Sequence, residues 1–438
     1  MITRIEAYRY RCFKTLNARM LPFHVLVGPN GAGKTTLLDV PVLLGEMVVF
    51  RSIEHAFQQQ TETHRRPRTD YARDLIFNQK GESFELAVEA EIPQQIVSSL
   101  VEKAVQGRQP KSAELYRNKP ERWPASVRYE IRFELFNEAL QIGEENIVLL
   151  PKNDSKVPRG TGISVAEWAR EHSSAAVPVI AVMERRRGGP ATFIPEMEKR
   201  ALPPFEFQPT EPAFANLFSD VSMFGASLWL RDLLMKDAGP YQPLLENLRR
   251  AQPPVRKPVL EKDASSLPWL IQNLKTSNPR AFERWIRMVQ LATPQIQDVE
   301  TVVRGDDMHG YLRVAYANDR KVPASGLSDG TLSVLATTIL PYLPVTPQLI
   351  MHEEPEHGIH PKGIEVILES LKAVKTGQVW ISSHSPVVLA HCEPKELFCL
   401  PLDEEGAAIA VAGDQHPALQ KWRSSLDLGT LFAAGVLG

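Results

Sequence analysis

The sequence lacks long apolar runs, is poor in cysteine and has almost no net charge, and each absence excludes a class of protein. No apolar stretch approaches the roughly 20 residues that span a bilayer, so we expect no membrane helix. The opening MITRIEAYRYRCFK alternates polar and apolar side chains and lacks the apolar core of a secretory signal, which predicts a cytoplasmic protein. Only Cys12, Cys392 and Cys399 occur, without a CxxC pair, so we expect neither a disulfide framework nor a cysteine zinc site.

Charge and periodicity set further limits. The formal net charge is -2, so any contact with nucleic acid depends on local basic patches. Two basic runs, at residues 64–68 and 185–187, are interpreted either as solvated loops or as contacts to a phosphate backbone. No segment sustains an apolar heptad over three or four repeats, so a long coiled-coil arm is not expected. The 438 residues are enough to bury a sizeable core.

Apolar periodicity predicts an α/β protein whose chemistry lies near both ends of the chain. Period-two alternation predicts strands, and apolar residues at helical spacing predict helices. The expected strands are residues 2–10, 16–27, 83–92, 126–136 and 311–317, and the expected helical stretches are 213–236, 267–292 and 331–340. We expect three segments: 1–150 with an antiparallel subdomain, a mostly helical inserted lobe at 151–307, and compact α/β structure at 308–438.

A glycine-rich loop follows the apolar stretch FHVLV and precedes a predicted helix. It matches GxxxxGK[ST] in full, the pattern of a phosphate-binding P-loop. Glycines let successive amides turn toward one centre, the helix N-terminus adds partial positive charge, and Lys34 supplies a mobile cation. Thr35 is placed to ligate magnesium. The residues expected to bind nucleotide here are Gly28, Pro29, Asn30, Gly31, Ala32, Gly33, Lys34, Thr35 and Thr36.

Three short elements follow in the last third of the chain. They are LSDGT at residues 327–331, the apolar run 348–351 leading into HEEPE at 352–356, and ISSHSP at 381–386. A carboxylate at the end of an apolar strand, Glu353, can hold magnesium, and the next, Glu354, can orient or deprotonate an attacking water. Ser328 and the amide of Gly330 begin a predicted helix and so form a second anion site.

The order and spacing of these elements resemble those of ABC-type ATPases of the SMC, RecF and OLD-like class. Glu353 comes 25 residues after Ser328, His384 comes 30 after Glu354, and EEPEHGIHP is similar to the DEPExGLHP of that class. The resemblance implies a P-loop NTPase fold of the ABC-ATPase head kind, ATP with Mg²⁺, and a homodimer or larger homo-oligomer. It also implies that Ser328 and Gly330 complete the nucleotide pocket of the opposite subunit, and that His384 contacts the γ-phosphate.

The chain departs from the class at two positions. Glu353 stands where an Asp is usual, and LSDGT stands where LSGGQ is usual, so we expect slow hydrolysis. The side chain of Asp329 is interpreted as a helix cap turned away from the nucleotide. Arg11 resembles a basic nucleotide-binding residue of the class or is an exposed strand arginine. Gln79 is either a metal-side glutamine of the class or a polar residue in a turn.

The sequence also allows interpretations as a zinc site, an α/β-hydrolase or a transporter subunit. His352, His357 and His360 lack the HExxH spacing, and Pro355 interrupts the helix that a zinc motif needs. Residues 326–330 also fit GxSxG, which makes an α/β-hydrolase with Ser328 as nucleophile a remote alternative. A transporter subunit is disfavoured because 294 residues separate Lys34 from Ser328, far more than in transporter ATPases.

Within the favoured class the function stays open between two settings. The chain resembles stand-alone AAA_21-like ATPases of prokaryotic anti-phage defence, which work beside a separate nuclease-like effector of the Toprim or HNH kind. The alternative is a DNA repair or recombination ATPase of the RecF or RecN type. About fifty residues follow His384, too few for a Toprim nuclease, so we expect no nuclease domain in this chain and DNA as a further partner.

Overall fold

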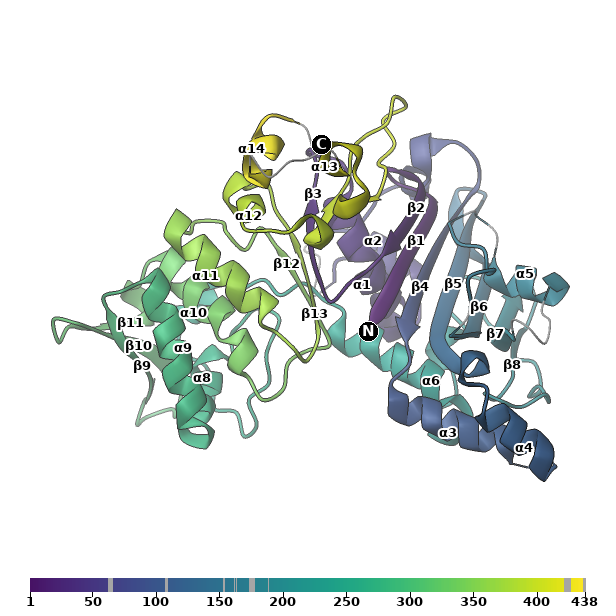
Figure 1. Ribbon diagram of the computed structural model, residues 1–438, viewed down its shortest axis with the longest axis horizontal. Helices are drawn as coiled ribbons and strands as arrows, with labels where there is room; N and C mark the ends of the chain where they lie inside the picture. Colours follow the sequence, from purple (N-terminus) through teal and green to yellow (C-terminus); the bar gives the residue numbers. More distant parts are fainter. Residues whose placement is uncertain are drawn as a thin grey trace. The chain divides into compact units, whose positions relative to one another are not determined.

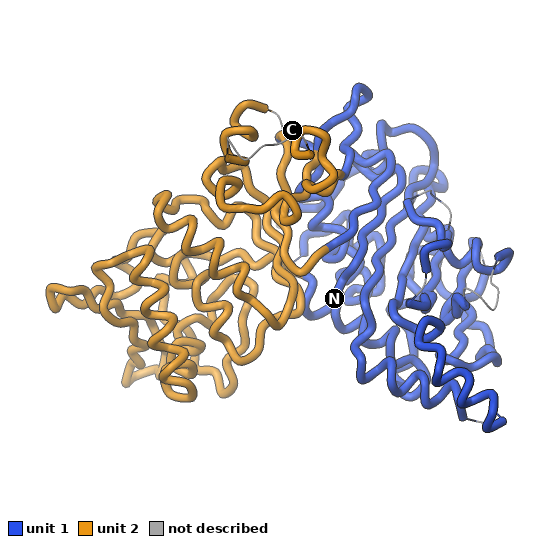
Figure 2. Tube along the Cα trace, viewed as in Figure 1, with its two compact units in different colours: residues 1–20, 30–238, 401–410 blue, residues 21–29, 239–400, 411–438 orange. Residues whose placement is uncertain are grey.

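The computed structural model describes residues 1–61, 66–106, 109–152, 154–160, 162, 164–172, 178–187, 189–420 and 427–435. These form two compact units, each built from separate stretches of the chain (Figure 2). Unit 1 comprises residues 1–20, 30–238 and 401–410, and unit 2 comprises residues 21–29, 239–400 and 411–438. The segment 151–307, expected as one inserted lobe, is therefore divided after residue 238.

Unit 1 is built on a seven-stranded antiparallel sheet with the order β2-β1-β4-β5-β6-β7-β8 (Figure 1). Its strands are β1 (Ile2–Tyr10), β2 (Phe13–Arg19), β4 (Ser83–Glu91), β5 (Pro124–Phe136), β6 (Ala139–Pro151), β7 (Ile180–Arg186) and β8 (Ala191–Phe193). Side chains alternate between the two faces of a strand, so each strand contributes to both faces. One face packs rings such as Phe84, Tyr129 and Phe133 into the core, and the other carries charged residues.

Helices of unit 1 pack on both faces and at the ends of this sheet. They are α1 (Lys34–Phe50), α2 (Ile53–Gln58), α3 (Gln94–Val105), α4 (Pro110–Arg117), α5 (Val165–His172), α6 (Val221–Asp232) and the π-helix η5 (Leu233–Asp237). Nearly every residue of α1 from Leu37 to Val48 is buried, which explains its apolar sequence on all sides.

The strands of unit 1 differ from the sequence prediction in two regions. Residues 139–151, for which no strand was predicted, form β6. Residues 180–193 were expected in a mostly helical lobe but form β7 and β8, which extend the antiparallel sheet. The Pro- and Gly-rich flanks hid these short strands, because their pairing with β6 is a contact between residues far apart in sequence. The antiparallel pairing of residues 83–91 with 124–136 is confirmed.

Unit 2 contains a five-stranded sheet with the order β12-β13-β3-β14-β15. Its strands are β3 (Phe23–Val27), β12 (Leu349–Glu353), β13 (Gln378–Ser382), β14 (Leu397–Cys399) and β15 (Val411–Ala412). All neighbours are parallel except β14 with β15. The expected strand 16–27 is thus wrong as one element, because residues 13–19 pair in unit 1 and residues 23–27 in unit 2.

The remaining elements of unit 2 bury a core that includes Trp285 and Ile381. A three-stranded sheet contains β9 (Ile296–Val303), β10 (Gly310–Tyr316) and β11 (Lys321–Pro323). The helices are α7 (Leu245–Leu248), α8 (Leu267–Ser277), α9 (Pro279–Ala292), α10 (Asp329–Thr338), α11 (Pro361–Lys372), α12 (Pro386–Ala390), α13 (Pro417–Gln420) and α14 (Leu428–Ala433). Among the described residues, no helix combines the length and apolar character needed to cross a membrane.

Candidate functional site

The predicted phosphate loop lies between β3 and α1, as the sequence indicated. Gly33 caps α1 with φ at 88°, and no side chain among the described residues caps that end of the helix. A helix N-terminus carries partial positive charge, which favours an anion at this end. A Cβ placed on Gly31 would meet no atom within 4 Å, so the crest of the loop faces open space. This geometry fits a bound phosphate group.

The turn between β1 and β2 packs against the end of this loop within unit 1. A Cβ on Gly33 would lie 2.5 Å from Sγ of Cys12, and the Cys12 thiol hydrogen-bonds the side chain of Thr36. Arg11 lies in the same turn with φ at 51°, and its Nη2 donates to the backbone oxygen of Arg68 at 2.7 Å. The turn that carries Arg11 thus contacts the loop, while its guanidinium is bonded to residue 68.

Arg68 corrects one interpretation of the basic runs. Its side chain is only 2 % exposed and donates to both oxygens of Asp39, at 2.7 and 2.8 Å, and to Glu46 and the oxygen of Ala56. Burial opposes its charge, but the carboxylates of Asp39 and Glu46 raise its pKa. Neither a solvated loop nor a phosphate contact describes this residue. His64 and Arg65 of the same run lie outside the described residues.

The second basic run is also partly buried. Arg185 lies on β7 and donates to the backbone oxygens of Glu211, Phe207 and Gln208. It is a core residue of unit 1, so both interpretations of its side chain were wrong. Arg186 and Arg187 of the run are exposed.

In unit 2 the predicted carboxylates and histidine meet at one edge of the parallel sheet. The register pairs Glu353 with Ser382, and Ser382 with Leu26 of β3. The amide of Glu354 donates to the oxygen of Ser382 at 2.9 Å, and that of Ser383 to Leu26 at 3.1 Å. Parallel strands end at the same edge, so the first residue of the phosphate loop follows directly from this edge. Open α/β sheets bind ligands there.

Glu354 has an unusual backbone at this edge. Its φ of 44° lies in the left-handed region, which costs about 1–3 kcal/mol in a residue other than glycine. Its side chain is 49 % exposed, and its Oε1 lies 3.9 Å from Nε2 of His384. Such outliers cluster at functional sites. The two residues that the sequence singled out for chemistry are therefore side by side and reachable.

Behind this pair lies a contact that sequence reasoning missed. The hydroxyl of Ser383 donates to Oε1 of Glu356 at 2.5 Å, while Oε2 of Glu356 is buried without a hydrogen-bond partner among the described residues. Burial raises the pKa of Glu356, and the charge of Glu354 adds to this. The signal was present in the sequence as the last glutamate of EEPE and the serine before His384.

Tyr241 is a second missed residue, and it joins two of the predicted elements. Its amide donates to the oxygen of Met351 on β12 at 2.6 Å, and its hydroxyl donates to the oxygen of Ala336 on α10 at 2.8 Å. Its ring also packs edge-on against His352. No local pattern marks this residue, because its partners are about 100 residues away in the chain.

The LSDGT segment begins α10, with Ser328 as the N-cap. The Ser328 hydroxyl accepts from the amide of Thr331 at 3.2 Å, and the Asp329 side chain forms an ion pair with Arg249. The expectation that Asp329 caps the helix is therefore wrong, because Ser328 is the cap and the side chain of Asp329 pairs with Arg249. A Cβ on Gly330 would lie 3.0 Å from the oxygen of Gly358, so the segment lies close to the loop after β12.

This geometry also contradicts the hydrolase alternative. A nucleophile elbow places its serine in a strained turn between a strand and a helix. Ser328 has the relaxed values φ −69° and ψ 155°, and it follows the short 3₁₀ turn Ala324–Gly326 instead of a strand.

Two weaker candidates have defined partners. Gln79 precedes β4 as expected, lies in a turn with φ at 54°, and donates through Nε2 to Asp74 at 2.8 Å. His352 is buried, which lowers its pKa to about 4, so it stays neutral at physiological pH. Its ring packs against the ring of Tyr241, so the residue contributes to packing.

In a comparison with known protein families, one family model matches part of the chain. Residues 219–390 match the AAA_21 family, described as "AAA domain, putative AbiEii toxin, Type IV TA system". The matched segment contains LSDGT, the paired glutamates and His384. No curated protein matches the chain in sequence.

Solved structures of SMC head domains are similar to the chain at 10% sequence identity. An SMC head bound to the C-terminal winged-helix domain of ScpA has a TM-score of 0.47, with 94% of this chain and 96% of that chain covered. The SMC head from Pyrococcus furiosus with an extended coiled coil, bound to the C-terminal domain of ScpA, has a TM-score of 0.45, with 94% of this chain and 95% of that chain covered. The SMC head from Thermotoga maritima has a TM-score of 0.39, with 94% of this chain and 98% of that chain covered.

The phosphate loop after β3 and the carboxylate that ends β12 have the sequence pattern and the placement of a P-loop NTPase site. Residues 219–390 are similar to the AAA_21 family.

Proposed function

We propose that this chain binds ATP with Mg²⁺, hydrolyses it slowly, and dimerises around the nucleotide. The observation that carries the proposal is the common edge of β12, β13 and β3. There the Glu353–Glu354 pair, His384 and the start of the phosphate loop follow adjacent parallel strands. A phosphate-binding loop beside exposed carboxylates is the arrangement that phosphoryl transfer to water needs.

Each proposed residue has a distinct role. The loop amides and Lys34 neutralise the phosphates, and Thr35 and Glu353, with Gln79, hold magnesium, which neutralises charge on the phosphate oxygens. Glu354 takes the proton of the attacking water, and His384 contacts the γ-phosphate. Ser328 and Gly330 of a second copy close the pocket. Arg11 is the further nucleotide-binding residue of the proposal, from a turn that packs on Gly33.

Slow turnover follows from the two departures noted in the sequence. Glu353 is one methylene longer than the usual Asp, which changes how the carboxylate reaches a metal. Asp329 adds negative charge beside the Ser328 anion site, although its ion pair with Arg249 offsets part of that charge. We therefore expect the chain to bind ATP but to hydrolyse it slowly.

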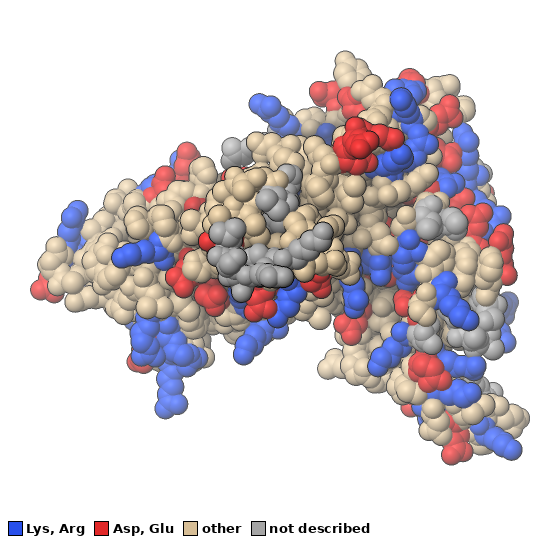
Figure 3. Space-filling model, turned by 45° about the horizontal axis from the view of Figure 1, so that its top comes forward, with Lys and Arg blue, Asp and Glu red and all other residues tan. Residues whose placement is uncertain are grey.

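The biological setting is proposed from the family. The description of the matched family as a toxin of a toxin–antitoxin system supports a role in prokaryotic defence. The cytoplasmic ATPase would then regulate a separate nuclease-like effector. DNA is a further proposed partner: positive and negative side chains intermingle on the face in Figure 3, while Arg280, Arg284 and Arg287 are exposed on α9. Such a local stripe can contact phosphates.

Two substitutions test the ATPase assignment. Lys34→Ala is expected to abolish ATP binding, because the amides alone do not neutralise a triphosphate. Glu354→Gln is expected to bind ATP with unchanged affinity and to lose hydrolysis, because the amide keeps the shape but not the base. Calorimetric titration with ATP and Mg²⁺ measures the first, and phosphate release measures the second.

Lys14→Ala is the matched control, since Lys14 is an exposed lysine of the same unit that pairs only with Glu405 among the interactions described. It should leave both quantities unchanged. ATP affinity that survives in Lys34→Ala would remove the phosphate loop from the proposal. Wild-type turnover in Glu354→Gln would move the base to another residue.

A further inference from the structure

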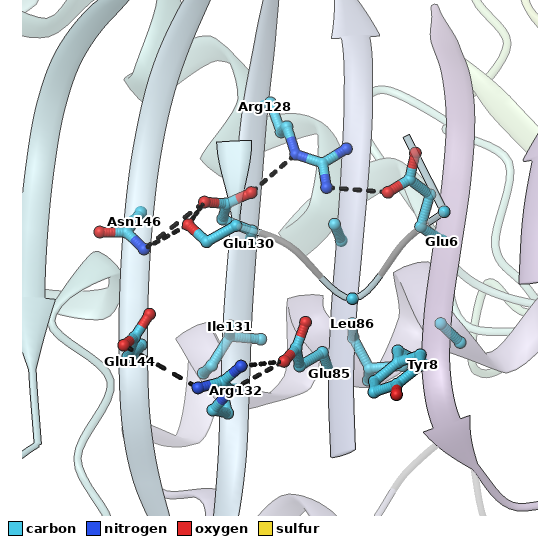
Figure 4. A pocket seen from close by; sticks show the side chains of 15 residues that line it. Glu6, Tyr8, Glu85, Leu86, Arg128, Glu130, Ile131, Arg132, Glu144 and Asn146 are labelled. Atoms are coloured by element: carbon cyan, nitrogen blue, oxygen red, sulfur yellow. Dashed lines mark hydrogen bonds and ion pairs between the residues drawn. The ribbon is translucent and has the colours of Figure 1, made fainter. Parts of the chain in front are cut away.

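Several buried carboxylates of unit 1 are paired with cations, whereas one carboxyl beside the predicted site of unit 2 is not. Figure 4 shows Arg128 of unit 1, which donates to Glu6 at 2.9 Å and to Glu130 at 2.8 Å. Such ion pairs offset the cost of taking a charge out of water. Glu356 of unit 2 has a buried carboxylate oxygen, but no lysine or arginine pairs with it among the described residues. A buried ion pair therefore does not explain its place.

The carboxyl of Glu356 binds the turn that carries His384. The hydroxyl of Ser383, a fully buried residue, donates to Oε1 of Glu356 at 2.5 Å. The backbone amide of His384 also hydrogen-bonds this carboxyl. The Ser383 hydroxyl in turn accepts from the amide of Ser385 at 3.0 Å. Three consecutive residues are therefore tied, directly or through one serine, to a single carboxyl.

This carboxyl links two loops that follow neighbouring parallel strands. Glu356 lies in the loop after β12, and residues 383–385 form the turn between β13 and α12. The amide of Glu354 donates to the oxygen of Ser382 at 2.9 Å, which joins the two loops where they begin. The bonds of the Glu356 carboxyl are thus a second link between the loops, placed further along both of them.

The second link matters because the two side chains proposed for chemistry do not hold each other. Oε1 of Glu354 and Nε2 of His384 are 3.9 Å apart, which is beyond hydrogen-bond distance. Their side chains are 49 % and 35 % exposed, so water weakens the attraction between them. Ser385 precedes α12 without a hydrogen bond from its side chain to the helix. The spacing between Glu354 and His384 is therefore set by the loops, and Glu356 holds those loops together.

Stability alone does not account for a carboxyl at this position. Burial raises the pKa of Glu356, and the negative charge of Glu354 raises it further. Oε2 of Glu356 is buried without a hydrogen-bond partner among the described residues. Both features oppose folding, because a buried acceptor without a donor loses its bonds to water. An apolar residue would avoid both costs, and groups with shifted pKa values cluster at functional sites, so the carboxyl favours a role at the site.

We propose that Glu356 is a positioning residue, which fixes His384 beside Glu354 by holding the hydroxyl of Ser383 and the amide of His384. Its effect on turnover rests on the proposed function, in which His384 contacts the γ-phosphate and Glu354 takes the proton of the attacking water. Glu356 itself touches neither the nucleotide nor that water. Loss of its acceptors frees the turn, so His384 meets the phosphate less often. ATP binding stays unchanged, since the phosphate loop supplies it.

Substitutions of Glu356 test this role through kcat and the dissociation constant for ATP. Glu356→Leu removes the acceptors without adding bulk, so kcat should fall at least tenfold while the dissociation constant stays within twofold. Glu356→Gln keeps an acceptor oxygen for Ser383 and should retain kcat within threefold. Ser383→Ala removes the donor, and its loss of kcat should not add to that of Glu356→Leu in the double variant. Glu365→Leu, at an exposed glutamate of α11, is the matched control and should change neither quantity.

A second readout needs no ATP hydrolysis. Diethyl pyrocarbonate should modify His384 of the nucleotide-free chain at least threefold faster in Glu356→Leu than in the wild type or in Glu356→Gln, because the turn is released. Mass spectrometry measures the rate, with the partly exposed His309 of the same unit as internal reference.

If thermal melting shows that Glu356→Leu does not fold, Ser383→Ala takes its place, with the same changes expected in both readouts. A wild type that hydrolyses no ATP contradicts the proposed function, while the modification rate of His384 still decides the positioning role. An unchanged rate in the folded variant, or equal losses of kcat in Glu356→Gln and Glu356→Leu, overturns the proposal.

Discussion

Arg68 shows how a single buried charge can hold a helix in position. Its guanidinium bonds Asp39 and Glu46, two acidic residues seven positions apart on α1, and its backbone oxygen accepts from Arg11. All three side chains are at most 11 % exposed, so water replaces none of these bonds. The residue therefore fixes the helix that begins at the phosphate loop.

Arg68→Ala is expected to lower the free energy of unfolding of unit 1 by about 3–5 kcal/mol. The substitution removes the buried guanidinium that bonds both carboxylates, and the loss of one partner of a buried ion pair costs more than the intact pair contributes. Denaturant unfolding followed by fluorescence measures the change. Arg66→Ala, two residues away and exposed, should stay within about 0.5 kcal/mol of the wild type. Equal midpoints for the two variants would show that the network carries no stability.

Single residues were predictable from the sequence where a short motif places them. Glu353 ends β12 and Lys34 begins α1, as expected, because the strand and helix beside each motif are marked by local apolar patterns. The roles given to these residues remain proposals. Arg68 was not predictable, since its partners depend on how residues 66–70 fold back onto α1. A run of arginines looks the same whether it is solvated or buried.

Among the elements, α1 and the π-helix η5 meet at a glycine. A Cβ on Gly45 would lie 2.1 Å from the backbone oxygen of Leu234, so the two backbones touch there. π-helical turns are rare and often occur at functional positions. The close approach holds η5 against the helix of the phosphate loop.

Two glycine substitutions should have opposite effects on stability. Gly45→Ala is expected to destabilise by about 1–3 kcal/mol, because the carbonyl of Leu234 is backbone and must move. Gly225→Ala, inside α6, has no neighbour closer than 3.8 Å and should stabilise by about 0.5–1 kcal/mol, since alanine favours the helix. Thermal melts of the two variants measure the signs. A stabilised Gly45→Ala would mean that α1 and η5 are less closely packed.

Helices and strands were predicted correctly where the local pattern of apolar residues is strong. The strand at 2–10, the strand predicted at 311–317 and found at 310–316, and the helical stretch predicted at 267–292 follow clear alternation or helical spacing. The structure divides that helical stretch into α8 and α9 at Asn278, which was not predicted. Residues 16–27 looked like one strand because both halves are apolar and alternating. The break at residues 20–22 moves the chain from one sheet to another, which depends on distant partners.

For the whole molecule, the division into two units was beyond sequence reasoning. Each unit is assembled from three separate stretches, and one boundary, at residues 29–30, falls inside the phosphate-loop motif at 28–35. Segments read along the chain cannot show such a division, because it depends on contacts between residues hundreds of positions apart. The phosphate loop itself thus passes from unit 2 into unit 1.

Association of two chains is the prediction that belongs to the whole molecule. Ser328 is exposed and caps α10, and its side chain bonds only Thr331 among the interactions described, so its side of the helix can meet a phosphate. In the ABC arrangement that the resemblance implies, that phosphate belongs to the nucleotide of the partner. The γ-phosphate then bridges the two subunits, and the interface is the same on both sides.

The Glu354→Gln variant should therefore sediment as a dimer with ATP and as a monomer with ADP, because only ATP supplies the bridging group and the variant does not consume it. Adding Ser328→Arg should return it to the monomer with ATP while leaving nucleotide affinity unchanged, since the long side chain occupies the phosphate contact. Ser277→Arg, at an exposed serine at the end of α8, is the control and should still dimerise. Sedimentation velocity with each nucleotide separates these cases. Identical association with ATP, with ADP and after Ser328→Arg would show that the nucleotide does not join the subunits, and the proposed role of Ser328 would then be wrong.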